Sequence, residues 1–150
     1  MLPDSPVTKV ASSGLIVVRR DDQRVRLLVL RRYSSWDFPA VQLEGDADPL
    51  EAAISETADA TGITDLTFPW GEEYRQTLPF EDGYVSRYYL AQTETQDVVL
   101  RIPAGAGSEE DYEYRWVTAE EAEDILPPRL AIVLEWALAQ IASAVPTRGG

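Results

Sequence analysis

The segment from Asp48 to Gly62 carries the start and stop signals of one amphipathic helix, and it constrains the fold more than any other part of the sequence. Asp48 is a good N-cap residue, Pro49 suits the first helical position, and Glu51 completes an Asp-x-x-Glu capping box. Gly62 is a typical C-terminal stop, so the pattern predicts a helix over about 49–61. Its inward stripe consists of Leu50, Ala53, Ile54, Thr57 and Thr61. A helix with such a stripe needs a partner surface to cover it.

Runs of β-branched and aliphatic residues lie on both sides of this helix in the sequence. Residues 13–19 and 25–31 predict a hairpin, because the polar stretch 21–24 separates them. Their continuous apolar character is typical of strands that are covered on both faces. Further strands are expected at 41–43, 73–79, 84–91, 98–102 and 112–117, with a turn at 81–83 and a loop at 103–111.

Two helices are expected after the last strand. Thr118 and Glu121 form a second capping box, which predicts a short helix to about Leu126. Pro127-Pro128 then begins a final helix, whose stripe is Leu130, Val133, Leu134, Ala137 and Ile141. Strands before and after a central helix, with terminal helices that cover the sheet, predict an α/β fold with three layers. We expect a single domain over 1–150, with its core at about 8–143 and frayed ends.

The composition excludes several kinds of chemistry. The chain has 150 residues and 45% hydrophobic residues, which is enough for one core, and it has no cysteine and no histidine. Disulfides, thiolate or imidazole metal sites, and cysteine or histidine catalysts are therefore excluded, which leaves carboxylates, hydroxyls, arginines and a hard metal ion. The net charge of -13 argues against binding a nucleic acid polymer. We expect no membrane segment and no secretory signal, and the high ratio of Arg to Lys suits a bacterial cytoplasmic protein.

The negative charge is concentrated in one stretch. Between Arg32 and Arg75 there are ten acidic residues and no Lys or Arg. One interpretation is a solvated acidic surface. The other is a carboxylate site for a hard divalent cation, which prefers oxygen ligands.

The stretch from Trp36 to Ile63 resembles the Nudix box and its lead-in. The signature of that family reads G-x5-E-x7-R-E-U-x-E-E-x-G-U, where U is a bulky aliphatic residue. Residues 14–32 resemble the opening hairpin of the family, and residues 114–122 resemble its closing strand and helix. Residues 75–91 are similar to the subgroup that hydrolyses diadenosine polyphosphates. The resemblance covers most of residues 10–142 and implies a Nudix-like α/β/α sandwich with a central mixed sheet.

The chain keeps part of this signature and departs from the rest. Glu56, Gly62 and Ile63 match. The departures are Val41 for the first glycine, Ala47 for the first glutamate, Ser55 for the arginine, Thr57 for the aliphatic residue, and Asp59 and Ala60 for the last two glutamates. The resemblance therefore implies a retained scaffold with a degenerate box.

In the family, carboxylates of this helix hold a metal ion against a pyrophosphate. The resemblance implies Mg²⁺ or Mn²⁺ here, bound by Glu56, Asp59 and the backbone carbonyl of Val41. The two acids are three residues apart and therefore share one helical face. A further catalytic acid is expected from the loop before the last strand, where Glu110 is favoured over Glu109, Asp111 and Glu113. The alternative for these four acids is a solvated loop.

Candidate substrate-binding residues come from the strands near 73–79 and 84–91. Tyr88 and Tyr89 lie where the diadenosine-hydrolysing subgroup has an aromatic pair, and Tyr88 is the candidate for stacking on a nucleobase, with sheet packing as the alternative. Arg75 and Arg87 are expected on adjacent strands, and an arginine suits a phosphate through its fork of donors. Each is also a candidate surface charge.

Two functions stay open at this point. The first is a metal-dependent hydrolase of a nucleoside diphosphate linked to another moiety, such as a dinucleoside polyphosphate, with activity weakened by the degenerate box. The second is a catalytically inactive Nudix-fold domain that binds a nucleotide, regulates, or interacts with a protein. The expected partner is a small-molecule nucleotide, and association into a homodimer is left open.

Overall fold

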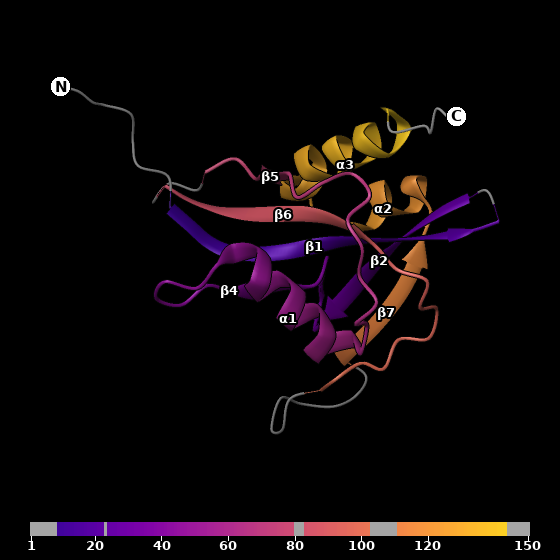
Figure 1. The fold of residues 1–150 in the computed structure, drawn as a ribbon, viewed down its shortest axis with the longest axis horizontal. Helices are drawn as coiled ribbons and strands as arrows, with labels where there is room; N and C mark the ends of the chain where they lie inside the picture. Colours follow the sequence, from indigo (N-terminus) through magenta and orange to yellow (C-terminus); the bar gives the residue numbers. More distant parts are fainter. Residues whose placement is uncertain (1–8, 23, 80–82, 103–110, 144–150) are drawn as a thin grey trace.

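The computed structural model describes residues 9–22, 24–79, 83–102 and 111–143, and within them one mixed sheet of seven strands lies between helices (Figure 1). The strands are β1 (Lys9–Asp21), β2 (Arg24–Arg32), β3 (Ser35–Asp37), β4 (Ala40–Gln42), β5 (Tyr74–Gln76), β6 (Tyr84–Gln92) and β7 (Tyr112–Val117). Their order is β3-β2-β1-β6-β5, with β4 paired to β1 and β7 paired to β2. β1 is parallel to β6 and antiparallel to β2 and β4, so the sheet is mixed as expected.

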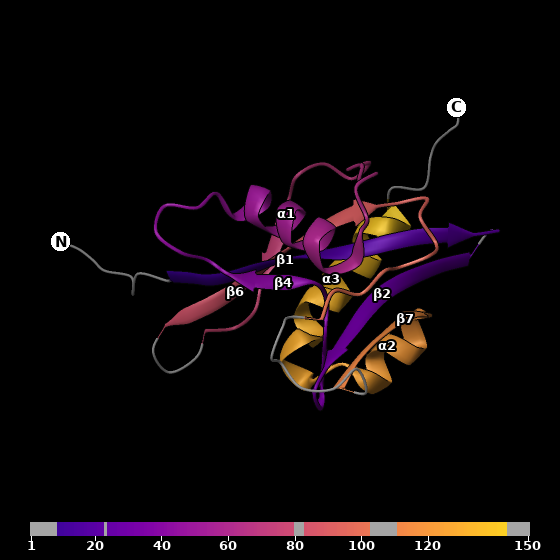
Figure 2. The same cartoon turned by 90° about the horizontal axis from the view of Figure 1, so that it is seen from below.

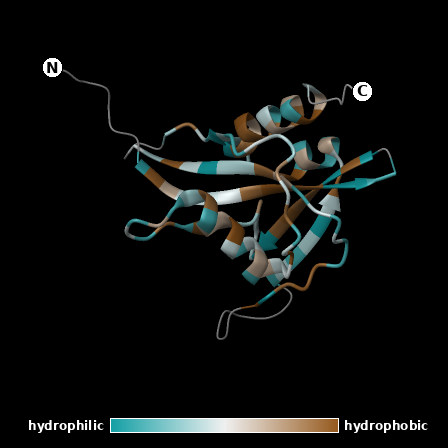
Figure 3. Ribbon diagram, viewed as in Figure 1, coloured by the Kyte–Doolittle hydropathy of each residue, from teal (hydrophilic) through white to brown (hydrophobic). Residues whose placement is uncertain are grey.

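Helices cover both faces of the sheet, which confirms the predicted α/β/α sandwich (Figure 2). The helices are α1 (Pro49–Thr61), α2 (Ala119–Ile125) and α3 (Ala131–Ser143), with the 3₁₀ turn η2 (Pro128–Leu130) before α3. Successive residues of β1 point to opposite faces: Leu15 and Val17 pack in the cluster with α1, and Ile16 and Val18 pack in the cluster with α2 and α3. All four are fully buried, as the apolar run predicted for a strand that is covered on both sides. Figure 3 shows the hydrophobic colour along the part of β1 that runs between the helices.

The helix boundaries predicted from the caps are confirmed. Asp48 accepts a hydrogen bond from the backbone N of Glu51 at 2.9 Å, and Gly62 ends α1 in the left-handed region at φ 79°. At α2, both halves of the capping box between Thr118 and Glu121 are formed. These local signals hold because each supplies a partner for a backbone group that the helix end leaves unsatisfied.

The expected strand at 98–102 is wrong. The backbone N of Val99 donates to the carbonyl of Thr61, and that of Arg101 donates to the carbonyl of Ala60. This segment therefore satisfies carbonyl groups at the C-terminal end of α1 instead of joining the sheet. β3 was not expected from the sequence, and β5 is shorter than predicted.

A close approach between β1 and the chain before β4 depends on Gly14. A Cβ atom at this position would lie 2.5 Å from the carbonyl oxygen of Pro39 and 2.8 Å from the Cβ of Ala40. Only glycine fits, and β4 is thereby held against β1, next to α1. None of the described helices is long and apolar enough to cross a membrane.

Candidate functional site

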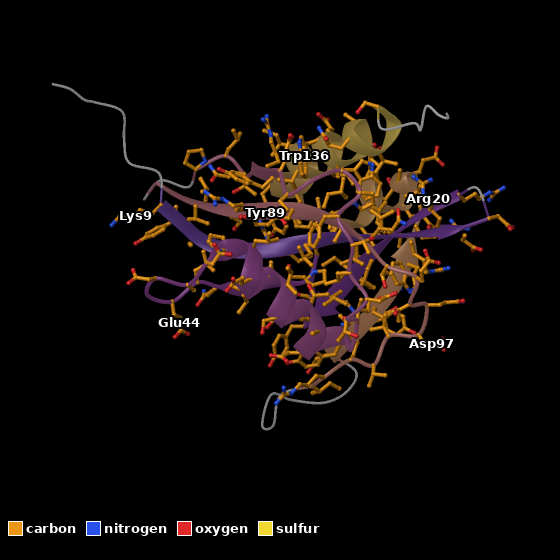
Figure 4. All side chains as sticks on the ribbon, in the orientation of Figure 1. Lys9, Arg20, Glu44, Tyr89, Asp97 and Trp136 are labelled. Atoms are coloured by element: carbon orange, nitrogen blue, oxygen red, sulfur yellow. The ribbon has the colours of Figure 1, made fainter. Side chains whose placement is uncertain are left out.

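An open hollow of about 270 Å³ lies between β4 and the exposed side of α1. It is lined by Val41, Gln42, Glu44, Ala47, Ala52, Ser55, Glu56 and Asp59. Glu44 projects from the loop that joins β4 to α1 (Figure 4). The structure thus brings Glu56, Asp59 and Val41 to one hollow, together with the departures Ala47 and Ser55.

Glu56 is held by a cation from outside the helix. Arg32, the last residue of β2, places Nη2 3.1 Å from Oε2 of Glu56. Ser55 occupies the position where the family signature has its arginine, so Arg32 supplies a positive charge that the helix itself lacks. No local pattern in the sequence marks Arg32 as a partner of Glu56, although it is the last cation before the long acidic stretch.

Two residues that depart from the signature, Val41 and Ala60, fit the local structure. Val41 lies in β4 and pairs with Ser13 of β1. Among the described non-glycine residues, positive φ occurs at Asp22 and Tyr33, so Val41 is not strained. Ala60 is 7% exposed and packs in the core, so a glutamate at this position would need room that the core does not offer.

The loop acids are only partly covered by the structure. Glu109 and Glu110 lie outside the described residues. Glu113 accepts hydrogen bonds from Arg115 at 2.8 Å and from Arg31 at 3.3 Å, and these bonds lower the pKa of its carboxyl. The register of β2 and β7 pairs Glu113 with Arg31, the neighbour of Arg32 in β2. Glu113 and Arg32 therefore point to opposite faces of the sheet, and Glu113 does not lie on the face where Arg32 contacts Glu56.

The donors in the hollow suit a hard divalent cation in type but are few. Within the described ranges, no group of three His, Cys, Asp or Glu residues is close enough to hold a metal ion. Mg²⁺ is commonly bound by one or two carboxylates, with water and substrate phosphates as its other ligands. Glu56 and Asp59 in an open hollow fit that kind of site, which is completed by the substrate.

The predicted substrate-binding residues lie away from this hollow. The register pairs Arg75 with Tyr88 and Gln76 with Arg87, so the two arginines point to opposite faces of the sheet and do not form a pair. Arg87 donates to Oε1 of Gln76 at 3.0 Å and stacks over Tyr74 at 3.9 Å. Moreover, β6 and β4 flank β1 on opposite sides, so Arg87 and the hollow are on different flanks of α1.

Tyr88 is 1% exposed and has no free ring face for a nucleobase, which corrects its assignment to stacking. Its ring packs edge-on against Phe38, and its hydroxyl donates to Oδ1 of Asp37 at 3.0 Å. Tyr89 is also buried, at 5% exposed. Alternation along the strand sends the two rings to opposite faces, and helices cover both of those faces.

Asp37 is the centre of a polar network that no local pattern in the sequence predicts. Its carboxylate accepts from Tyr88, from Nη2 of Arg129 at 2.9 Å and from the backbone N of Phe38. Burial raises the pKa of Asp37, against the opposing charge of Arg129, and burial also raises the pKa of Tyr88. A second hollow of about 140 Å³ is lined by Leu30, Arg32, Ser35, Asp37, Phe38 and Ala40. Arg32 therefore borders this second hollow and contacts Glu56 of the first.

The comparisons with known proteins agree with the fold described above. The model of the NUDIX domain matches residues 9–137. No curated protein sequence matches the chain. Among solved structures, a binary complex of a C. elegans Ap4A hydrolase is similar at 25% identity and a TM-score of 0.72, over 88% of this chain and 98% of that chain.

Two other solved structures share the fold at lower identity. The M. smegmatis Nudix hydrolase RenU has 18% identity and a TM-score of 0.65, over 96% of this chain and 92% of that chain. The NUDIX domain of Shewanella oneidensis NrtR, complexed with ADP ribose, has 13% identity and a TM-score of 0.61, over 93% of this chain and 90% of that chain. At these identities the likeness shows the fold alone.

Proposed function

Because the chain belongs to the Nudix family, we propose that it is a hydrolase of nucleoside diphosphates linked to another moiety, with dinucleoside polyphosphates as the first substrates to test. The observation that carries this proposal is the hollow in which Glu56 and Asp59 lie together, with Arg32 at its border. The similarity to an Ap4A hydrolase supports the choice of substrate class. Activity is expected to be low, because Ala47, Ser55 and Ala60 lack the charged groups of the signature.

A divalent cation, of the kind that Nudix hydrolases generally use, would bind Glu56 and Asp59 here and would supply charge stabilisation and an activated water. Arg32 holds the Glu56 carboxylate in position through their ion pair. A guanidinium has five N–H donors, so an arginine that contacts Glu56 also has donors for a phosphate oxygen. The hollow is open, which gives a pyrophosphate access to these groups.

A second candidate is a nucleotide-binding domain without catalysis. It is favoured by the small number of acids: the described residues contain no group of three metal-ligating side chains, and Glu56 is already paired with Arg32. Fold alone does not decide between the two candidates, because the same fold hosts both kinds of function.

The test is phosphate release from a panel of nucleotides and dinucleoside polyphosphates, with Mg²⁺ and with Mn²⁺. We expect slow hydrolysis by the wild type and at least a tenfold loss in Glu56→Gln, since one of two charged ligands is removed. Glu135→Gln, an exposed position on α3, is the matched control and should keep the wild-type rate.

The double variant Ser55→Arg, Asp59→Glu restores two missing groups at residues that line the hollow, and it leaves the buried Ala60 unchanged. We expect it to raise the rate by up to about 100-fold, because positioning and electrostatic effects each reach that order. If neither the wild type nor a well-folded double variant turns over any substrate, the hydrolase proposal is overturned. Nucleotide binding without turnover then supports the second candidate.

A further inference from the structure

Two tyrosines form an exposed pair beside the candidate site. Tyr33 follows the last residue of β2, and Tyr112 is the first residue of β7. Their ring centroids are 5.6 Å apart and the rings are tilted by 55°. Tyr33 is 53% exposed, so its ring offers a large surface to a ligand, while Tyr112 is half-buried.

The backbone holds Tyr33 in an uncommon conformation. Its φ is 61°, in the left-handed region that non-glycine residues rarely adopt. The backbone N of Tyr33 donates to the carbonyl of Asp111 at 2.6 Å, and Nη1 of Arg31 donates to the carbonyl of Tyr33 at 2.6 Å. Hydrogen bonding to Tyr33 is also the main cause that raises the pKa of Tyr112. The exposed ring is therefore fixed from its backbone and from its neighbour, which reduces the entropy that a ligand would lose on binding to it.

The tyrosine pair is next to the acidic hollow. The register of β2 and β7 pairs Arg32 directly with Tyr112, so these two side chains lie on the same face of the sheet. Arg32 in turn contacts Glu56 at 3.1 Å. A carboxylate, a cation and two aromatic rings thus follow one another along this face, over Glu56, Arg32, Tyr112 and Tyr33.

We propose that the Tyr33–Tyr112 pair is a stacking platform for the nucleobase of a nucleoside polyphosphate whose phosphates lie in the hollow beside Arg32. This inference rests on the proposed function of that hollow. An aromatic ring face binds a base by stacking, and the adjacent guanidinium binds the phosphates of the same ligand. Stacking tolerates any base, so the platform selects nucleotides over inorganic phosphates rather than one nucleotide over another.

The test compares the affinity of the full chain for ADP and for inorganic pyrophosphate, by calorimetry with Mg²⁺ present. Tyr33→Asn removes the ring, and asparagine tolerates positive φ. Tyr33→Phe retains the ring. We expect Tyr33→Asn to weaken ADP binding about tenfold, as expected for the loss of one stacked base, and to leave pyrophosphate binding unchanged. Tyr33→Phe should bind ADP within about threefold of the wild type. Tyr84→Asn, at the far end of the sheet, is the matched control and should bind like the wild type.

The outcomes separate this inference from the function on which it rests. If the wild type binds ADP no more tightly than pyrophosphate, or if Tyr33→Asn weakens both equally, the platform is overturned while the phosphate site stands. If the wild type binds neither ligand, the proposed function and the platform both fail.

A measurement on the wild type covers the case in which Tyr33→Asn does not fold. Photolabelling with 8-azido-ADP should modify a peptide that contains Tyr33 or Tyr112, and labelling confined to other peptides overturns the platform.

Discussion

The two faces of the sheet differ in the partners and the surroundings of their polar side chains. Toward α3, Asp37 accepts from the buried Tyr88 and from Arg129 beside an apolar cluster, and the side chains of Asp37 and Arg129 are 29% and 37% exposed. On the face covered by α1, Arg32 and Glu56 form an ion pair whose side chains are 43% and 20% exposed, at the border of an open hollow. The hydroxyl of Tyr88, which is 1% exposed, needs its partner Asp37 for folding, whereas the Arg32–Glu56 ion pair contributes little to stability and is available to a ligand in the hollow.

Tyr88 and Tyr89 show the same difference within one strand. Tyr88 points toward α3 and donates to Asp37, while Tyr89 points toward α1 and packs edge-on against the exposed Tyr74. We therefore expect substitutions on the α3 face to lower the free energy of unfolding, and substitutions near the hollow to lower ligand affinity.

The largest expected effect is on stability, from Leu130→Ala. Leu130 is fully buried under the α3 face, so the substitution leaves a cavity and should lower the free energy of unfolding by about 2–5 kcal/mol. Urea unfolding measures this loss, and nucleotide affinity measured under native conditions should not change. A loss below about 0.5 kcal/mol would contradict the assignment of Leu130 to the core.

A smaller effect, with a characteristic pH dependence, is expected from Asp37→Asn. Burial raises the pKa of Asp37 in the folded state, so the folded protein binds this proton more tightly than the unfolded chain does. Stability from this group is therefore fully present below the ordinary pKa and is lost as the pH rises through the folded-state pKa. The wild type should lose stability relative to Asp37→Asn over this range.

The measurement is urea unfolding of both proteins from acid to neutral pH. At neutral pH the variant should still be less stable than the wild type, by on the order of 1 kcal/mol, because the charged contact with Arg129 is lost, and this difference should be larger at acid pH. Asp46→Asn, on the exposed loop before α1, is the control and should reproduce the wild-type profile. A difference between wild type and Asp37→Asn that is constant with pH would show that Asp37 titrates normally.

The smallest effect on stability is expected from Arg32→Ala, and this variant tests the α1 face. Loss of an exposed ion pair should cost at most about 1 kcal/mol, but affinity for Mn²⁺ with ADP should fall about tenfold because Glu56 loses its fixed position. Adding Ser55→Arg should restore the affinity to within about threefold, since it places a cation on the helix next to Glu56. Arg24→Ala, at the other end of β2, is the matched control. If adding Ser55→Arg does not restore this affinity, Arg32 does not take the place of an arginine on the helix.

Local signals in the sequence predicted most of the scaffold and part of the site. Caps predicted α1 and α2 because they depend on contacts within four residues, and the apolar runs of β1 and β2 predicted a doubly covered hairpin. The helical period also placed Glu56 and Asp59 on one face, where the structure has the hollow. The prediction of a strand at 98–102 was wrong because backbone donors of this segment bond to the end of α1. That partner is distant in the sequence, and no local pattern reveals it.

What only the tertiary structure decided is which distant residues meet. Strand register set Arg75 and Arg87 on opposite faces, buried Tyr88 against Asp37, and placed Arg32 between Glu56 and Tyr112. A shift of one residue in register moves every side chain to the other face, and the alternation of a doubly buried strand does not reveal which face is which. The sequence by itself therefore determined the helices, the hairpin and the acidic helix face, because their signals are local. The partners of that face come from other strands, and their positions depend on long-range pairing that local periodicity does not encode.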